Sequence, residues 1–184
     1  MADFSIYYPK LLRYEGGYAS PAYAAKMGDT GGETYCGIAR NYNKDWAGWK
    51  IIDDYKKQKG EPAYNSRIND PQLYELALEL TKKQYWDKIR MDEVNSQSLA
   101  EMIMDFGFNS GIGTSIKAVQ NILKMPITAV VNNGDIIAIN KADAHTLFTQ
   151  LQNYRITMIQ NSGKINPKFK DGLIARAKSF TFQS

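Results

Sequence analysis

The sequence predicts a mainly α protein with one small β-hairpin near its N-terminus. Apolar residues recur every three or four positions through most of the 184 residues, which is the spacing of one helix face. Residues 27–38 interrupt this pattern with a polar stretch rich in glycine, which favours a turn between short strands. Pairs such as Asp-Pro and Asn-Pro mark where helices begin.

The first helix is expected between Asp3 and Glu15. Asp3 is a suitable N-cap. Pro9 predicts that the helix either begins near this residue or is kinked there. Gly16 and Gly17 can adopt the left-handed conformation that commonly ends a helix.

Three further elements are expected before residue 90. Gly31-Gly32 is the expected two-residue turn of the hairpin within residues 27–38. A helix over Trp46–Lys59 follows and stops at the next glycine. Asp70-Pro71 combines an N-cap with a first-turn proline, and it opens a helix that continues to about Tyr85.

The C-terminal half is expected to be helical throughout, apart from one ambiguous stretch. The first two expected helices run from Ser96 or Ser98 to Asn109 and from Thr114 to about Lys124. A longer helix is expected from Ala142 to Asn161, with an apolar stripe of Leu147, Leu151, Tyr154 and Met158. The last expected helix begins at Asn166-Pro167, and the residues expected to face the core are Phe169, Leu173, Ala177 and Phe180. Residues 126–139 are apolar and β-branched yet contain Asn132-Asn133-Gly134, so an extended loop, a small hairpin and a helix all fit.

Composition excludes several classes of protein. Cys36 is the one cysteine, which rules out an intramolecular disulfide, and His145 is the one histidine. Because catalytic zinc usually takes three protein ligands, these counts argue against zinc amidases and peptidases, and we expect no metal and no cofactor. A net charge of +4 and a pI near 9.0 favour anionic partners. Nucleic acid and the bacterial cell wall are two such candidates, and the lack of a nucleic-acid-binding motif argues against nucleic acid.

The N-terminus and the apolar runs bear on localisation. Met1–Ser5 has neither a basic n-region nor an apolar h-region, so we expect no secretory signal peptide and synthesis in the cytoplasm. No run approaches the roughly 18–20 apolar residues that span a bilayer, so no stable membrane insertion is expected. Work on the cell wall would then need another exit route.

Glu15 is the main candidate for a catalytic acid. It lies in the last turn of the first expected helix, where the negative end of the helix dipole disfavours a carboxylate by roughly 0.3–1 kcal/mol. A general acid must keep its proton near neutral pH, so burial would have to contribute the rest. Asp29, Glu33 and Thr34 add polar groups that could face it. An idle, exposed glutamate before a glycine cap fits the position as well.

The residues around Glu15 resemble a known family. Three segments closely resemble the signature of the family 108 glycoside hydrolases: Glu15-Gly16-Gly17-Tyr18, the segment from Asp29 to Thr34, and Gly37-Ile38. These are bacterial and phage N-acetylmuramidases with a lysozyme-like fold. Thr30 replaces the proline that is usual in this signature, and Cys36 stands where the family often has lysine.

The resemblance continues downstream. Later motifs of the family are similar to Tyr85-Trp86 and to the run from Asp105 to Gly111. The start of a predicted peptidoglycan-binding region resembles Ala118-Val119-Gln120. By this resemblance we assign residues 1–90 to a lysozyme-like catalytic region. Residues 91–184 are assigned to a helical region that completes the fold and resembles that binding domain. The loop near Asn109–Gly113 is the best soft boundary.

The resemblance implies an α+β lysozyme-like fold. It also implies hydrolysis of the β-1,4 bond between N-acetylmuramic acid and N-acetylglucosamine in peptidoglycan glycan strands. Glu15 would be the catalytic acid, with Asp29 and Thr34 as its partners and Glu33 as a competing second carboxylate. The candidate substrate-binding residues are Tyr18, Glu33, Tyr35, Trp86 and Asn109.

Three alternatives stay open. A lytic transglycosylase also uses one glutamate and no metal, and a non-catalytic wall-binding module could share the fold. Cys36 and His145 have the order of a thiol-hydrolase pair, although packing or surface roles are the commoner explanation of both. The absence of a signal peptide further fits a bacteriolytic endolysin of phage or prophage origin that reaches the wall by holin-type or other leaderless release, and we expect it to be a monomer.

Overall fold

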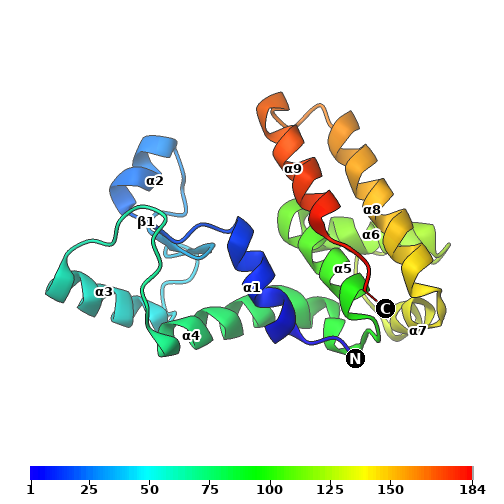
Figure 1. The fold of residues 1–184 in the computed structure, drawn as a ribbon, viewed down its shortest axis with the longest axis horizontal. Helices are drawn as coiled ribbons and strands as arrows, with labels where there is room; N and C mark the ends of the chain where they lie inside the picture. Colours follow the sequence, from blue (N-terminus) through cyan, green and yellow to red (C-terminus); the bar gives the residue numbers. More distant parts are fainter. Residues whose placement is uncertain (184) are drawn as a thin grey trace. The chain divides into compact units, whose positions relative to one another are not determined.

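The computed structural model describes residues 1–183 and is mainly helical, with a small sheet near the N-terminus (Figure 1). The expected fold class is therefore confirmed. Its contacts divide the chain into two compact units. We call Tyr8–Lys82 the sheet unit, and Met1–Tyr7 together with the described residues from Lys83 onward the helical unit. The division falls inside the first helix and shortly before residue 90.

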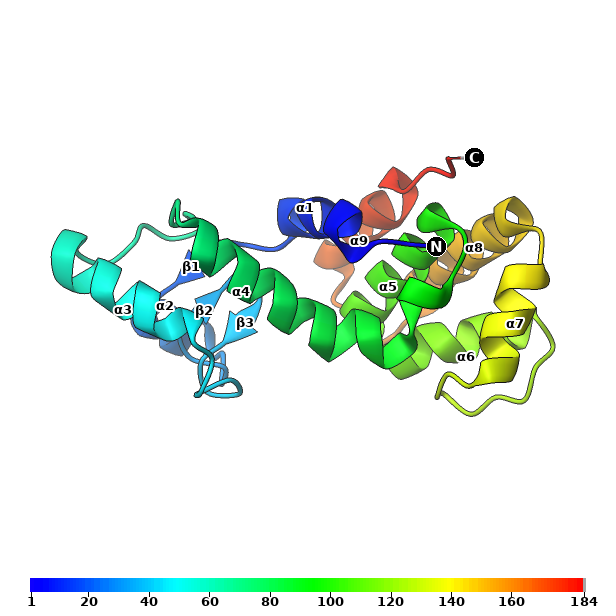
Figure 2. The same ribbon diagram turned by 90° about the horizontal axis from the view of Figure 1, so that it is seen from below.

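The sheet unit holds three two-residue strands and the helices that surround them. Its elements are α1 (Phe4–Tyr14, which begins in the helical unit), β1 (Tyr18–Ala19), α2 (Pro21–Met27), β2 (Thr34–Tyr35), β3 (Ile38–Ala39), α3 (Gly48–Lys59) and α4 (Pro71–Thr81). The strands form one antiparallel sheet in the order β1-β2-β3 (Figure 2). Tyr35 on β2 lies opposite Tyr18 on β1 and opposite Ile38 on β3.

α1 begins as the sequence predicts and ends differently. The Asp3 carboxylate accepts a hydrogen bond from the Ser5 amide at 2.7 Å, and Pro9 lies inside the helix without ending it. The expectation that Gly16 or Gly17 ends α1 in the left-handed conformation is wrong, because neither has a positive φ. Each glycine instead lies close to the loop at residues 65–66.

Gly17 lies directly against the loop at residues 65–66. Its amide donates to Asn65 Oδ1 at 2.8 Å, and the Tyr18 amide donates to the Ser66 carbonyl at 2.8 Å. A Cβ atom on Gly17 would overlap the Ser66 carbonyl group. Glycine is therefore required here for contact between backbones rather than for an unusual φ.

The expected hairpin is present, but its turn is not at Gly31-Gly32. β2 and β3 are joined by Cys36-Gly37, whose φ angles of 49° and 82° suit the primed turns that connect two-residue hairpins. Gly31-Gly32 lies in the loop that leads into β2, where the Asp29 carboxylate accepts a hydrogen bond from the Gly31 amide at 2.8 Å. Gly31-Gly32 and Cys36-Gly37 are both possible turns, and the strand register decides between them.

Helix starts in the sheet unit follow their capping residues. Asp70 accepts from the Leu73 amide at 2.8 Å and α4 starts at Pro71, as expected. The expected helix over Trp46–Lys59 appears as α3. α2 was not predicted, although Ser20 caps it through the Tyr23 amide at 3.2 Å and a proline follows, which is the same signal that marks α4.

The helical unit is built around one buried helix. Its elements are η1 (Lys82–Trp86, a π-helical turn that starts at the division), η2 (Asp87–Ile89), η3 (Met91–Glu93), α5 (Gln97–Ser110), α6 (Ile112–Ile122), α7 (Asn133–Lys141), α8 (Ala144–Asn161) and α9 (Pro167–Ser179). α5 is buried on all sides from Ser98 to Gly107 and contacts α6 and α8, while α8 also contacts α9 (Figure 1). A helix buried all round is the core of its unit.

Two expected helix boundaries in this unit change. Thr114 does not cap α6, because the helix begins at Ile112 directly after Gly111. The ambiguous stretch 126–139 contains the start of α7, which opens with a capping box between Asn132 and Asp135.

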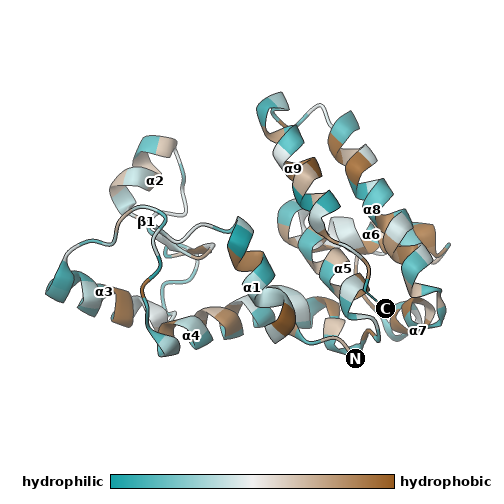
Figure 3. Cartoon of the chain, in the orientation of Figure 1, coloured by the Kyte–Doolittle hydropathy of each residue, from teal (hydrophilic) through white to brown (hydrophobic). Residues whose placement is uncertain are grey.

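The buried faces of the last two helices also differ from expectation. Polar and apolar residues alternate along both (Figure 3). On α8 the buried row is Leu147, Leu151, Arg155 and Ile159, so Tyr154 and Met158 lie outside it. On α9 Phe169 is exposed. Among the described residues, no helix combines the length and the apolar character needed to cross a membrane.

A buried ion cluster joins α5, α8 and α9. The Asp105 carboxylate is fully buried and pairs with Arg155 at 2.7 Å and with Arg176 at 2.7 Å. The Tyr7 hydroxyl donates to it at 3.0 Å, and burial together with the Asp105 charge holds the pKa of Tyr7 well above its usual value. Arg155 occupies an apolar position of the helix period because this carboxylate compensates its charge.

Replacing Asp105 by asparagine tests the cluster. We expect Asp105→Asn to lower the free energy of unfolding by about 3–5 kcal/mol, because it leaves buried arginine charge uncompensated. Urea unfolding followed by circular dichroism measures this. Asp171→Asn, on the exposed face of α9, is the matched control. A loss no greater than that of the control would contradict the assignment.

Candidate active site

The candidate site is a cavity of about 180 Å³ beside the end of α1, within the sheet unit. Its lining residues are Glu15, Gly16, Gly17, Tyr18, Ala19, Tyr23, Thr34, Gly37, Tyr64 and Asn65. Of these described residues, Glu15 alone carries a carboxylate. The volume is below the roughly 300–1,000 Å³ of a typical small-molecule pocket, so the cavity suits one part of a long ligand.

Glu15 follows the last residue of α1 and is partly buried. Its amide continues the helical pattern by donating to the Leu11 carbonyl at 3.0 Å. Its own carbonyl accepts a hydrogen bond from the Arg67 guanidinium at 3.1 Å. The backbone that carries this acid is therefore held at both its amide and its carbonyl.

Thr34 reaches the same cavity from β2. It lies opposite Ala19 of β1 and opposite Ala39 of β3, so the sheet fixes its backbone on both sides. Its hydroxyl donates to the Gly32 carbonyl at 3.1 Å. The structure thus brings together three of the residues that the sequence singled out, which are Glu15, Tyr18 and Thr34.

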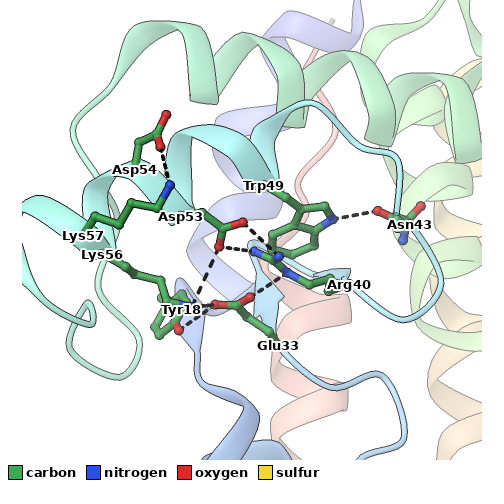
Figure 4. Close-up of polar contacts among 9 residues, drawn as sticks. All are labelled: Tyr18, Glu33, Arg40, Asn43, Trp49, Asp53, Asp54, Lys56 and Lys57. Atoms are coloured by element: carbon green, nitrogen blue, oxygen red, sulfur yellow. Dashed lines mark hydrogen bonds and ion pairs between the residues drawn. The ribbon is translucent and has the colours of Figure 1, made fainter.

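Tyr18 connects the cavity to a buried ion network (Figure 4). Its hydroxyl donates to Glu33 at 2.7 Å, and the pKa of Tyr18 is raised by burial and by this carboxylate. Glu33 is 4% exposed and pairs with Arg40 at 2.6 Å and with Lys56 at 2.7 Å. Arg40 in turn holds Asp53 through two nitrogens, at 2.7 and 3.1 Å. The Glu33 carboxylate is committed to this network and is not among the cavity-lining groups.

Asp29 and Tyr35 lie in the sheet unit but outside the cavity lining. Asp29 is exposed in the loop after α2, where it holds the Gly31 amide. Tyr35 is buried, and its hydroxyl lies 3.2 Å from the Ile68 amide. It lines a second cavity of about 400 Å³ whose other lining residues include Tyr8 and Tyr74.

Trp86 and Asn109 belong to the helical unit. Trp86 is fully buried and its indole donates to Asp92 at 2.6 Å. Asn109 accepts a hydrogen bond from Arg155 at 2.9 Å. Both side chains therefore have structural contacts within that unit.

The thiol and the imidazole also lie in different units. Cys36 is buried in the β2–β3 turn, and burial raises its pKa. His145 lies near the start of α8 with its ring 4.9 Å from that of Phe182. A raised pKa disfavours the thiolate that nucleophilic chemistry needs.

Sequence reasoning missed two aromatic residues at the cavity, Tyr23 on α2 and Tyr64 in the loop before α4. Their ring centroids are 4.2 Å apart and the Tyr23 hydroxyl donates to that of Tyr64 at 3.1 Å, which raises the pKa of Tyr23. Tyr64 is 62% exposed. The Ser20-Pro21 helix start could have placed Tyr23, whereas no motif marks Tyr64.

Comparison with known proteins connects this geometry to a family. The model of the glycosyl hydrolase 108 family matches residues 8–111, which include every residue that lines the cavity. No curated protein sequence matches the chain.

Among solved structures, SagA of Brucella abortus has a similar fold. The TM-score is 0.62 and the sequence identity is 18%, and the match covers 98% of this chain and 97% of that one. At this identity the likeness concerns the fold alone.

The family model covers more than half of the 184 residues, and it includes both the end of α1 and the sheet. A helix-end glutamate beside a small sheet is the arrangement that the sequence resemblance implied. The chain therefore belongs to the glycosyl hydrolase 108 family, and it is a peptidoglycan hydrolase of the N-acetylmuramidase type.

Proposed function

We propose that Glu15 is the general acid with which this enzyme cleaves the β-1,4 bond between N-acetylmuramic acid and N-acetylglucosamine. The observation that carries the proposal is that Glu15 is the one carboxylate among the described cavity-lining residues. Protonated Glu15 donates its proton to the glycosidic oxygen as positive charge develops on the sugar ring. The leaving sugar then departs as an alcohol, and water completes the hydrolysis.

Thr34 is proposed as the group that orients the attacking water. It lines the same cavity as Glu15, and the sheet fixes its backbone. Orienting a water molecule requires a hydroxyl at a fixed position and no change in its own charge. Asp29 is kept as a proposed second carboxylate, because it is exposed on the loop that leads into β2.

The Tyr23 and Tyr64 rings are proposed as a platform for a sugar ring at the cavity rim. A flat aromatic face packs well against the C–H groups of a pyranose, and the tyrosine hydroxyls can bond to its polar groups. Because the cavity is small, most of the glycan must lie outside it, where such a platform is needed. Tyr18 forms part of the cavity wall. We propose only an indirect role, through support of the core and the backbone, for the remaining candidates Tyr35, Trp86, Asn109 and Glu33.

We further propose a bacteriolytic role of the phage or prophage endolysin kind, with release by a holin-type or other leaderless route. The enzyme would act as a monomer that does not insert into a membrane. The net charge of +4 supports approach to the anionic cell wall, most strongly at low ionic strength.

Replacing the acid is the direct test of the reaction. We expect Glu15→Gln to lower activity by about 10²–10⁴-fold, because glutamine cannot donate the proton. The release of reducing ends from purified peptidoglycan and the clearing of permeabilised cells both measure this. Glu79→Gln, on the exposed face of α4, should behave as wild type. Full activity of Glu15→Gln would overturn the proposal.

The role of Thr34 predicts a difference between two small substitutions. Thr34→Val keeps the shape and removes the hydroxyl, and it should lower kcat by about 10²-fold through a misplaced water. Thr34→Ser should keep most of the activity. Mass spectrometry of the products adds a second readout, since hydrolysis gives reducing ends that have gained water. Equal activity of both variants would show that the hydroxyl has no part in the reaction, and a loss in Asp29→Asn instead would favour that carboxylate.

The aromatic platform predicts an effect on binding. Tyr64→Ala should raise KM for soluble glycan strands about 3- to 10-fold, the worth of one aromatic contact, with little change in kcat. Tyr64→Phe keeps the ring and should stay close to wild type. Tyr154→Ala removes another exposed tyrosine, which belongs to the helical unit, and serves as the control. An unchanged KM in Tyr64→Ala would exclude the platform.

A further inference from the structure

The C-terminal end of α1 is capped by a side chain from a distant loop. The last turn of a helix leaves carbonyl groups without partners inside the helix, and a left-handed glycine commonly helps to satisfy them. Gly16 and Gly17 do not adopt that conformation. Instead, Nη2 of Arg67 donates to the carbonyls of Leu12 and Glu15, the latter at 3.1 Å.

The backbone on both sides of Arg67 is tied to the sheet. The Asn65 amide donates to the Tyr18 carbonyl at 2.7 Å, and the Tyr18 amide donates to Ser66 at 2.8 Å. On the other side, the Ile68 amide donates to the Tyr35 hydroxyl at 3.2 Å. The guanidinium therefore has a fixed origin, and it links the sheet to the residue that carries the acid.

The Arg67 charge is favourable at this place. A cation at a helix C-terminus interacts well with the negative end of the dipole. The guanidinium also hydrogen-bonds the Cys36 thiol, whose pKa is raised by burial and lowered again by Arg67. The titratable groups that line the cavity together with Glu15 are Tyr18, Tyr23 and Tyr64. Arg67 and Cys36 line the neighbouring cavity that also contains Tyr35.

We propose that Arg67 is the positioning residue of the catalytic acid. Its guanidinium fixes the Glu15 carbonyl, and this sets the direction in which the Glu15 side chain enters the cavity. The inference rests on the proposed role of Glu15.

The experiment compares Arg67→Met, Arg67→Lys and the control Arg13→Met. Arg13 is exposed in the last turn of the same helix, so Arg13→Met removes the same charge from the same helix end and leaves the Arg67 bonds in place. All three are measured with soluble peptidoglycan glycan strands for kcat and KM. Circular dichroism gives the folded fraction at the assay temperature, and rates are expressed per folded molecule.

Arg67→Met should lower kcat about 10- to 100-fold through misplacement of the acid, with KM nearly unchanged. Arg67→Lys keeps the charge and a hydrogen-bond donor but not the guanidinium fork, so kcat should recover only in part. Arg13→Met should match wild type in kcat.

Two results would overturn the inference. One is wild-type kcat per folded molecule in both Arg67 variants, which would leave Arg67 a purely structural role. The other is an equal loss in Arg13→Met, which would indicate a general charge effect. If Arg67→Met does not fold, the kcat and KM of Arg67→Lys still decide. Failure of the proposed acid is a separate result, since Glu15→Gln would then remain active whatever the Arg67 variants do.

Discussion

The sheet unit depends on the buried carboxylate of Glu33. Strands of two residues make too few hydrogen bonds to hold a sheet by themselves. Glu33 compensates by joining Tyr18 of β1 to Lys56 of α3 and to Arg40, whose guanidinium also lies 4.5 Å from the Trp49 ring centroid (Figure 4). Removing a charge from water is costly, and it is tolerated here because the partners surround the carboxylate. The walls of the candidate active site are positioned by this network.

The helical unit uses the same principle with different elements. Asp105 on the buried helix α5 gathers Arg155 and Arg176 from α8 and α9. Ion pairs of this kind are directional, whereas apolar contacts are not, so they fix the rotation of each helix about its axis. Each unit therefore has a buried carboxylate that is held by two basic side chains, Glu33 in one and Asp105 in the other.

Local signals in the sequence predicted the helices well and the long-range contacts poorly. Asp70-Pro71 and Asn166-Pro167 act on their own neighbours, so the starts of α4 and α9 could be read directly. The role of Gly17 could not, because the Ser66 backbone that it contacts comes from a distant loop. Arg155 likewise looks like a surface residue until Asp105 is placed beside it. The position of a buried charge is set by its partner and not by its own segment.

The candidate site shows the same limit. Glu15 and Thr34 belong to a motif, so the sequence could single them out. Tyr64 comes from a loop without any motif, and its proximity to Tyr23 follows only from the fold. Catalytic groups need particular residue types at fixed spacing, whereas a packing or binding surface can be made by many sequences.

The burial of Cys36 in the β2–β3 turn affects how this thiol responds to oxidants. Outside the reducing cytoplasm, an exposed single thiol reacts with oxidants or links two chains through a disulfide. Cys36 is 7% exposed, and burial keeps its pKa above the ordinary value. Both properties keep the sulfur protonated and inaccessible. A lone cysteine in this setting is therefore protected both from oxidants and from disulfide formation between chains.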